Sequence, residues 1–315
     1  MSKLFCLGEL LIDFQPIGNK PLKDTLQFVK NAGGAPANVC VQAVKLGRDA
    51  AYLTKVGKDA FGDFLIEALE SEGVDTSFIT QTDKYDTSLA FVSLGEGGER
   101  QFSFYRRTAA DLHFTPQDFA SVTIKKGDVF EYGSVALNGD DARSTHEYLI
   151  DKASQAGALI CFDPNLRFNL WDSGDELKEA VLTYAKYADV IKVGADELEF
   201  LLGERNPFEA FGDRLKVLLV TDGGKGAKVY TRDGKMYSCN GFKVNAVDTT
   251  GAGDSFFGGF ISSIMQNNAT PENILSNVDL QKALTIACKC GAYTTTNYGA
   301  IPAMGDMKTI DKAVK

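Results

Sequence analysis

Short apolar runs alternate with amphipathic runs along most of the chain. Unbroken apolar runs predict buried β-strands at 3–7, 51–56, 158–163, 190–193 and 217–221. Apolar residues at helical spacing predict helices at 35–46, 61–69, 176–188, 195–202 and 251–265. This alternating order is typical of an α/β fold, in which a mostly parallel central sheet carries helices on both faces.

A different pattern occupies residues 87–107. Polar residues fill every second position there and alternate with apolar residues. The apolar positions include Leu89 and Phe91 in the first half of the stretch and Phe104 in the second half. The glycine-rich segment 95–99 predicts the hairpin turn between the two runs. Strands of this kind do not fit a parallel sheet that is covered on both faces, so the hairpin is expected to project, with one face toward water or a ligand.

Residues 14–29 also interrupt the alternation, because they are irregular and only partly apolar. We expect a single α/β domain over residues 1–315, with a small β-sheet lid formed by about 14–30 and 85–110. The sequence contains no internal repeat and no low-complexity segment that would divide the chain further.

The balance of charge is acidic, since 42 Asp and Glu residues against 33 Lys and Arg residues give a net charge of −9. Such a surface argues against nonspecific binding of nucleic acids or anionic membranes. No run approaches the roughly 20 apolar residues that a membrane span needs, and the first apolar run is broken too early for a signal peptide. Six scattered cysteines without zinc-site spacing suit free thiols in a reducing cytoplasm.

The strongest local motif is Val247-Asp-Thr-Thr-Gly-Ala-Gly-Asp-Ser255. The small residues Gly251, Ala252 and Gly253 let consecutive backbone N–H groups turn toward one point, where the following helix also aims the positive end of its dipole. This arrangement is an anion hole suited to a transferring phosphoryl group. Asp254 either accepts the proton of an attacking hydroxyl or only offsets the dipole, and the conformational cost of the glycines favours the first role.

A second glycine motif spans residues 31–38. Gly33 and Gly34 allow a ligand to approach the backbone closely. Asn38 lies just inside the predicted helix, where its amide can bond a ligand hydroxyl, although an ordinary helix start is the alternative. Asp13, just past the first strand, is either an acceptor for ligand hydroxyls or an ordinary loop acid.

Three further candidates also have ordinary alternatives. Arg106 and Arg107, at the end of the hairpin, are charged donors for a substrate or a solvated basic pair. The turn 221–226 follows a buried strand, so its N–H groups and Lys225 are placed for nucleotide phosphates, or it is a plain tight turn. Glu197 is either an acid that binds Mg²⁺ through water or a surface helix residue.

Absent motifs narrow the chemistry. The sequence has no GxxxxGK[ST] motif, which excludes a P-loop kinase. It has no GxGxxG motif after the first strand, which argues against an NAD-dependent enzyme. Its two histidines, His113 and His146, lie in no recognisable catalytic motif.

Taken together, these features resemble the ribokinase-like (PfkB) carbohydrate kinases and, within them, the fructokinases. Residues 33–57 are similar to the first signature of the family and residues 248–260 to the second. Fructokinase-like segments lie in order along the chain, at 8–14, 102–111, 162–167 and 191–201. The resemblance implies a ribokinase-like fold with a substrate crevice at the carboxyl ends of the strands, under the lid.

The resemblance also implies roles for individual positions. Asp254 matches the catalytic base, and the anion hole is matched by Gly251, Ala252 and Gly253. Sugar-binding positions are matched by Asp13, Gly33, Gly34, Asn38, Arg106 and Arg167. ATP-binding positions are matched by Lys192, Gly194, Thr221, Gly223, Lys225, Gly226, Val244 and Ala287. Glu197 matches an acid linked to Mg²⁺, and a loop for a monovalent cation such as K⁺ is matched by Asp248, Thr250, Thr294, Asn297, Gly299 and Ala303.

Two positions depart from the family pattern. Gly194 stands where Asn or Ser is usual, which removes a side-chain contact on the nucleotide side. Thr108 stands where fructokinases often have Pro, at the lid. Neither departure removes the base or the anion hole.

The activity implied is transfer of a phosphoryl group from ATP, with Mg²⁺, to fructose, at the 6-hydroxyl. A 2-keto-3-deoxygluconate kinase or a ribokinase of the same fold remains an alternative, as does a non-catalytic sugar-binding regulator. The apolar face of the lid implies a homodimer through lid sheets, and elution at monomer mass in size-exclusion chromatography would contradict it.

Overall fold

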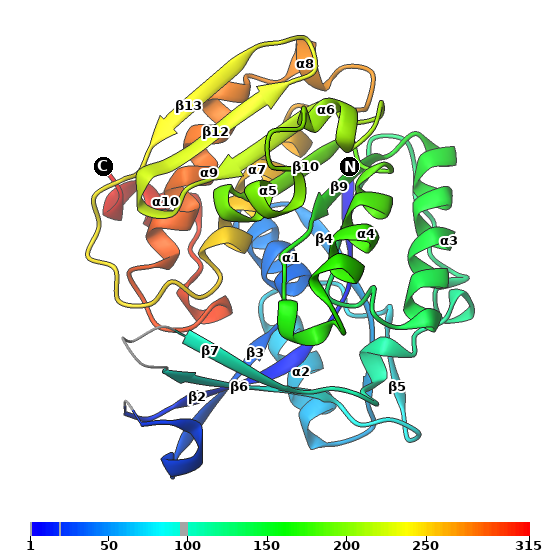
Figure 1. The fold of residues 1–315 in the computed structure, drawn as a ribbon, viewed down its shortest axis with the longest axis vertical. Helices are drawn as coiled ribbons and strands as arrows, with labels where there is room; N and C mark the ends of the chain where they lie inside the picture. Colours follow the sequence, from blue (N-terminus) through cyan, green and yellow to red (C-terminus); the bar gives the residue numbers. More distant parts are fainter. Residues whose placement is uncertain (1, 19, 95–99) are drawn as a thin grey trace.

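The structure is a computed structural model that describes residues 2–18, 20–94 and 100–315. Among these residues, a nine-stranded sheet crosses the larger part of the molecule in the order β13-β12-β11-β10-β9-β8-β1-β4-β5 (Figure 1). Neighbouring strands are parallel except for the pairs that β12 forms with β11 and with β13. The strands are β1 (Lys3–Leu7), β4 (Asp49–Gly57), β5 (Ile79–Thr82), β8 (Val129–Gly133), β9 (Leu159–Asp163), β10 (Val190–Gly194), β11 (Val217–Thr221), β12 (Gly226–Thr231) and β13 (Met236–Asn240).

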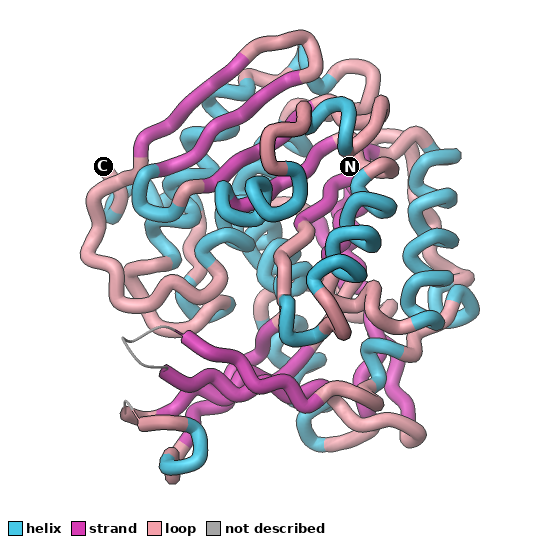
Figure 2. The backbone as a smooth tube through the Cα atoms, viewed as in Figure 1, coloured by secondary structure: helices cyan, strands magenta, loops and turns pink. Residues whose placement is uncertain are grey.

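Helices cover both faces of this sheet, which confirms the predicted α/β class (Figure 2). Residues alternate along β1 between two buried clusters, so that Leu4 and Cys6 lie in one and Phe5 and Leu7 in the other. The first cluster includes residues of α1 (Ala35–Lys45), α2 (Ala60–Ser71), α7 (Ala252–Gln266) and α9 (Leu280–Thr294). The second includes residues of α3 (Asp140–Ala156), α4 (Gly174–Ala185) and α5 (Ala195–Leu202). Short helices are α6 (Pro207–Ala210), α8 (Ile274–Asn277) and α10 (Met307–Ala313).

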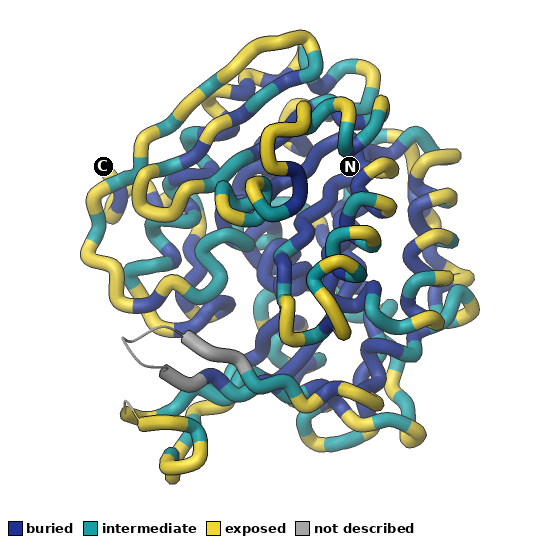
Figure 3. Tube along the Cα trace, viewed as in Figure 1, coloured by how far each residue is buried: buried dark blue, intermediate teal, exposed yellow. Residues whose placement is uncertain are grey.

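The predicted strands and helices are present, with ends that differ by a few residues. For example, α4 was expected at 176–188, but the Ser173 side chain accepts a hydrogen bond from the Glu176 N–H and starts the helix at Gly174. The apolar pattern left β8, β12, β13, α3 and α9 unpredicted. Several of these elements are only half-buried, as in β13, where exposed and intermediate residues alternate (Figure 3).

A second, four-stranded sheet projects from the first, at the bottom of Figure 1. Its order is β3-β2-β6-β7, and its strands are β2 (Leu11–Pro16), β3 (Phe28–Gly33), β6 (Ser88–Leu94) and β7 (Arg100–Tyr105). We call this sheet the lid. The predicted turn at 95–99 lies outside the described residues. The stretch 14–29 was expected to be irregular. It in fact begins in β2 and ends in β3, and these two strands pair with each other. Strand β2 also pairs with β6.

The two faces of the lid differ in character. Phe14 stacks on Phe91 at 4.8 Å and meets Phe61 of α2 edge-on at 5.7 Å, so one face packs against the body. Asp13 and Phe104 are both in register with Ala90, which places them on the opposite face. Phe91 and Phe104 therefore lie on opposite faces of the hairpin, and the second face is turned toward the crevice described below.

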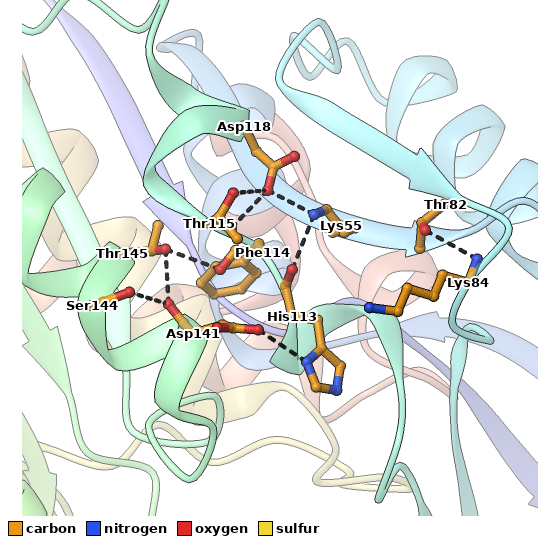
Figure 4. A network of polar contacts seen from close by, with 10 residues as sticks. All are labelled: Lys55, Thr82, Lys84, His113, Phe114, Thr115, Asp118, Asp141, Ser144 and Thr145. Atoms are coloured by element: carbon orange, nitrogen blue, oxygen red, sulfur yellow. Dashed lines mark hydrogen bonds and ion pairs between the residues drawn. The ribbon is translucent and has the colours of Figure 1, made fainter.

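Polar contacts fix the segment that leaves the lid (Figure 4). Lys55 Nζ lies 2.7 Å from Asp118 Oδ2 and donates to the His113 carbonyl at 3.0 Å. His113 Nδ1 lies 3.1 Å from Asp141 Oδ2 of α3, and its ring stacks on Tyr85 at 3.8 Å. Because Tyr85 precedes β6 and His113 follows β7, both chain ends of the hairpin are tied to the body at one place.

Candidate active site

A cavity of about 340 Å³ lies between the lid and the beginning of α7. We call it the polar cavity. It is lined from the lid, from both glycine motifs and from the carboxyl ends of the central strands. Its lining residues are Glu9, Leu11, Asp13, Gly34, Ala35, Asn38, Phe104, Val135, Asn165, Arg167, Lys192, Thr249, Thr250, Gly251, Gly253 and Asp254. The structure thus brings together most of the predicted sugar-side residues and the motif at 251–254.

Asp254 lies in the first turn of α7 and is held from α1. Its Oδ2 accepts a hydrogen bond of 2.8 Å from Asn38 Nδ2. Burial raises the pKa of Asp254, while Lys192, the Asn38 amide and Arg167 act in the opposite direction. A carboxylate held in this way is a stronger base than one in water, and it is oriented toward the cavity that it lines.

Close packing of three helices fixes the position of Asp254. A Cβ atom on Gly258 would lie 2.7 Å from the Val39 carbonyl of α1, and one on Gly259 would lie 2.8 Å from the Cys290 sulfur of α9. Glycine at these two positions therefore lets α7 approach both neighbours. A buried chain of side chains joins the same helices, since Ser255 Oγ donates to Gln42 Oε1 at 2.8 Å and Thr294 Oγ1 to Ser255 Oγ at 2.8 Å.

The glycines of the anion-hole motif meet specific backbone needs. Gly251 has a φ of 74°, and a Cβ atom there would lie 2.7 Å from the Ala300 Cβ. Both the left-handed backbone and the close approach require glycine. A Cβ atom on Gly253 would lie 3.1 Å from Lys192 Nζ, so the Lys192 ammonium stands directly beside the start of α7.

Lys192 forms a buried ion pair with Asp163. The Lys192 Nζ to Asp163 Oδ2 distance is 2.8 Å, and both side chains are almost fully buried. Burial lowers the pKa of Lys192, but Asp163, Glu197 and Asp254 outweigh this effect and raise it, so the side chain is a cation. Burial also raises the pKa of Asp163 to about 6, with Lys192 acting against the shift.

Two further carboxyl groups line the polar cavity. Burial raises the pKa of Asp13 to about 7, with Arg167 lowering it and Asp254 raising it. A Cβ atom on Gly33 would lie 2.1 Å from Asp13 Oδ2, which explains the glycine at that position. Sequence reasoning missed Glu9, whose Oε1 accepts from the Ala35 N–H at 2.9 Å and whose pKa burial raises to about 7. Glu9 lies two residues before β2, and its approach to the glycine motif at 33–34 forms only in the fold, so no local signal pointed to it.

Arg106 does not line the polar cavity. Its guanidinium is buried, donates to the Val135 carbonyl at 2.8 Å and lies 3.2 Å from Asp111 Oδ2. Ser88 Oγ also donates to Asp111, at 2.7 Å, so this group joins β6 to the end of the hairpin. Arg106 and Arg107 line a separate cavity beside Trp171. The contacts of Arg106 therefore favour a structural role over the predicted substrate contact.

A second cavity of about 440 Å³ lies on the other side of the α7 N-terminus. We call it the apolar cavity. Of the residues predicted to bind ATP, its lining includes Thr221, Gly223, Gly226 and Val244, while Gly253 and Thr249 line both cavities. Gly224, within the predicted turn 221–226, also lines the apolar cavity. Sequence reasoning missed Ala227, Gly241, Phe242, Ala246, Phe256, Cys288, Gly291, Ala292 and Thr295.

Four predicted nucleotide-side residues lie outside the apolar cavity, and one of them, Lys192, lines the polar cavity instead. Lys225 is exposed, and its Nζ lies 3.2 Å from Asp222 Oδ2. Ala287 is fully buried beneath the cavity wall, so the adjacent Cys288 takes its place. Gly194 starts α5 and donates its N–H to Glu197 Oε2 at 2.7 Å.

The predicted metal-linked residues also have contacts within the protein. Glu197 Oε1 accepts from the Leu166 N–H at 2.8 Å, so both of its oxygens are bonded to backbone. The described residues contain no group of three His, Cys, Asp or Glu side chains that could hold a metal ion. Asp248 accepts from the Thr250 N–H at 2.7 Å and from the Gly299 N–H at 3.0 Å, which brings two parts of the predicted cation loop together. Thr294 ends α9 beside them, and the remaining members, Asn297 and Ala303, lie in the segment that follows α9.

In the described part of the chain, no helix combines the length and the apolar character needed to cross a membrane.

The chain is similar to known proteins over its whole length. Probable fructokinase-4 of Arabidopsis thaliana is 40% identical, with 100% of this chain and 97% of the relative covered. A crystal structure of fructokinase from Vibrio cholerae O395 in a fructose, ADP and calcium ion bound form has a TM-score of 0.88 at 32% identity, covering 100% and 99% of the two chains.

Fructokinase with bound ATP from Xylella fastidiosa has a TM-score of 0.87 at 31% identity, covering 99% of this chain and 97% of that one. The model of the pfkB family of carbohydrate kinases matches residues 1–306. The structural neighbours also confirm the ribokinase-like fold that the sequence predicted. The chain therefore belongs to the pfkB family of carbohydrate kinases.

Proposed function

We propose that this protein phosphorylates fructose with ATP, at the 6-hydroxyl. The observation that carries the proposal is the position of Asp254, a half-buried carboxylate that lines the polar cavity next to Gly253, which lines both cavities. Fructokinases resemble the chain over its whole length, and one was crystallised with fructose and ADP. The proposal assigns fructose to the polar cavity and ATP to the apolar one.

Asp254 acts as the general base. It accepts the proton of the 6-hydroxyl as that oxygen attacks the γ-phosphorus, and the bond to the bridging oxygen of ADP breaks. The hydrogen bond from Asn38 keeps one carboxylate oxygen occupied, so the other is presented to the substrate. The sugar is held through its hydroxyls by Asp13, Arg167 and the backbone at Gly34.

Charge on the transferring group is stabilised by the N–H groups at 251–253, by the helix dipole and by Lys192. The Asp163 carboxylate orients Lys192 for this role. Mg²⁺, when bound, neutralises charge on the ATP phosphates. Because both Glu197 oxygens are bonded to backbone, we assign Glu197 an indirect role through water, with most Mg²⁺ ligands from phosphates and water. A K⁺ ion at the 248–250 and 294–303 segments is part of the same proposal.

The lid supports two further parts of the proposal. It covers the polar cavity with Leu11, Asp13 and Phe104, which excludes water that would hydrolyse ATP. Between β2 and β3, Ile17 and Leu26 are exposed, which suits a homodimer through this part of the protein. Size-exclusion chromatography tests the dimer by its mass. Six free cysteines suit a reducing compartment such as the cytoplasm.

The test is ADP release with ATP and Mg²⁺ against fructose, ribose, glucose and 2-keto-3-deoxygluconate. Fructose should give the highest kcat/KM, and Asp254→Asn should lower kcat about 10²–10⁴-fold with little change in KM. Asp140→Asn is the matched control, since Asp140 is an exposed acid in the first turn of α3 that only meets the helix dipole. A better substrate that still needs Asp254 would move the assignment to another kinase of the family. ADP release that does not depend on Asp254 would remove the proposed base.

A further inference from the structure

A third cavity lies beside Trp171, at the end of the lid hairpin. We call it the tryptophan cavity. Its volume is about 710 Å³, against about 340 Å³ for the polar cavity. Phe104 lines both cavities. The Arg106 guanidinium lines the tryptophan cavity and donates to the carbonyl of Val135, which lines the polar cavity. The two cavities therefore share a wall.

Two residues of the tryptophan cavity carry buried polar atoms that lack a partner among the described residues. Trp171 is only 8% exposed, and its indole Nε1–H donates to no acceptor. The Asn138 Oδ1 accepts from no donor, although Nδ2 of the same amide donates to the Leu170 carbonyl at 3.0 Å. Buried polar groups are normally paired. One unpaired donor and one unpaired acceptor at the same cavity fit a hydroxyl group, which can both accept and donate.

Charges of both signs lie at this cavity. Arg107 and Asp172 are both exposed at its wall. Glu176 also lines it, and its carboxylate lies 3.6 Å from the Arg143 guanidinium. The Arg106 guanidinium is already ion-paired, as described above. Since positive and negative groups offset one another, the cavity does not favour an anion or a cation. A neutral ligand with several hydroxyls can use the donors and the acceptors alike.

We propose that the tryptophan cavity is a second carbohydrate-binding site, for a neutral sugar the size of a disaccharide. The polar cavity is assigned a single fructose, and the tryptophan cavity is the larger of the two. A ligand there fills the space beyond Phe104 and holds that ring against the polar cavity. Occupancy should therefore tighten the binding of fructose, and this part of the inference rests on the proposed function.

The chain contains its own probe for this site. Trp171 is the only tryptophan in the sequence, so tryptophan fluorescence reports on this cavity. The experiment titrates the protein, without ATP, with maltose, trehalose and lactose, which are neutral disaccharides that contain no fructose. At least one of them should change the emission in a saturable way, because a new hydrogen bond to the indole N–H alters the surroundings of the ring. The protein unfolded in urea should show no saturable change.

A pair of variants tests the location of the site. Asp172→Ala should weaken binding of the disaccharide about fivefold, the size expected for the loss of one hydrogen bond. Asp172 is exposed, so the substitution should not disturb folding. Asp175→Ala is the matched control, since Asp175 is an exposed acid three residues further along that does not line this cavity. It should bind the disaccharide as the wild type does.

Calorimetry with fructose measures the coupling between the two cavities without turnover. A saturating concentration of the disaccharide should lower the Kd for fructose about fivefold, the low end of the usual range for two coupled sites. An unchanged Kd would show that Phe104 does not couple the cavities. A higher Kd would place the disaccharide in the polar cavity and overturn the second site.

The remaining outcomes separate the second site from the proposed function. The inference is wrong if none of the three disaccharides gives a saturable change, since the cavity then holds only water. It is also wrong if Asp172→Ala binds the disaccharide as tightly as the wild type. If fructose does not bind in calorimetry, the proposed function fails, while the titration of Trp171 still decides whether the second site exists.

Discussion

The two cavities at the start of α7 are built from different chemistry. The polar cavity collects four ionisable side chains from three parts of the chain: Glu9 and Lys192 are buried, and Asp13 and Asp254 are half-buried. The apolar cavity is walled mainly by glycine, alanine and other small or apolar residues. The apolar cavity can bind its ligand through shape and apolar contact area alone. The polar cavity, in contrast, must accept a proton and stabilise charge.

The difference has an energetic consequence. Burying the carboxyl groups raises their pKa values, which costs folding free energy whenever they are ionised. Glycine and alanine at the apolar cavity carry no such penalty. Catalytic groups concentrate in the polar cavity, where burial is costly. The effects of substitutions should therefore differ between the two cavities in their size, in their pH dependence and in the kinetic constant that changes.

After Asp254→Asn, the largest effect is expected from neutralising Lys192. Lys192→Met should lower kcat about 10²–10³-fold, because the cation beside Gly253 then no longer stabilises the transferring group. The single variant also leaves Asp163 buried without its partner, which destabilises the protein. The double variant Lys192→Met/Asp163→Asn removes that unpaired charge. It should recover stability in urea unfolding without recovering kcat.

Lys178→Met is a suitable control, since Lys178 Nζ donates to the Phe200 carbonyl in α5, away from both cavities. It should leave kcat unchanged. Recovery of kcat in the double variant would show that Lys192 acts only on folding, and the comparison between the cavities would lose its main contrast.

How much of this contrast the sequence could predict differs between the cavities. The motif at 251–254 and Asn38 were found because glycine and a following helix have a local chemical meaning that spacing reveals. Lys192 was matched to an ATP-binding position through the resemblance, but its place in the polar cavity depends on Asp163, 29 positions away. Glu9 likewise depends on Ala35, 26 positions away, and no local pattern encodes either contact. Arg106 shows the reverse case, because a charged residue at a strand end was assigned to substrate but is buried against Asp111.

The apolar cavity was harder to predict for a physical reason. Its wall includes Cys288, Gly291 and Ala292, which follow the ordinary pattern of a packed helix. Small residues on α9 serve close packing against α7 as well as they serve a ligand. These packing residues form a cavity wall only because α9 lies beside the loop at 223–226. The fold, in contrast, depends on apolar runs, which is why the central strands β1, β4, β9, β10 and β11 were predicted. The equally buried β8 was missed, since Glu131 interrupts its apolar run.

A smaller effect is expected at Asp13, where pH is the informative variable. The pKa of Asp13 is raised to about 7, so kcat/KM should increase as pH rises toward 7 and Asp13 becomes an ionised acceptor for the sugar hydroxyls. Asp13→Asn should lower kcat/KM about 10–100-fold above pH 7, the size expected for hydrogen bonds to a charged group. The part of the acidic limb that Asp13 contributes near pH 7 should disappear from the profile.

Stability gives an independent test of the same residue. The folded-state pKa lies above the unfolded one, so the folded state binds the proton more tightly, and this stabilisation is present at low pH and lost as pH rises through about 7. Asp13→Asn should therefore be more stable than the wild type in urea unfolding at about pH 8, by an amount that shrinks toward about pH 5. Asp24→Asn, an exposed acid on the same part of the chain, should show no such trend. A gain that is independent of pH would mean that Asp13 is not buried as an acid.

The smallest effect is expected in the apolar cavity, from Val244→Ala. Removing the two methyl groups of this half-buried side chain costs about 1 kcal/mol of nucleotide contact, so KM for ATP should rise roughly fivefold. The change should be the same at every pH and should leave kcat unaltered, because the wall contacts ATP equally in the ground and transition states. Val247→Ala, three residues along the same segment and outside the cavity, should have no effect on KM. If Val244→Ala lowered kcat instead, the wall would take part in the transition state, and the division between a binding cavity and a reacting cavity would be wrong.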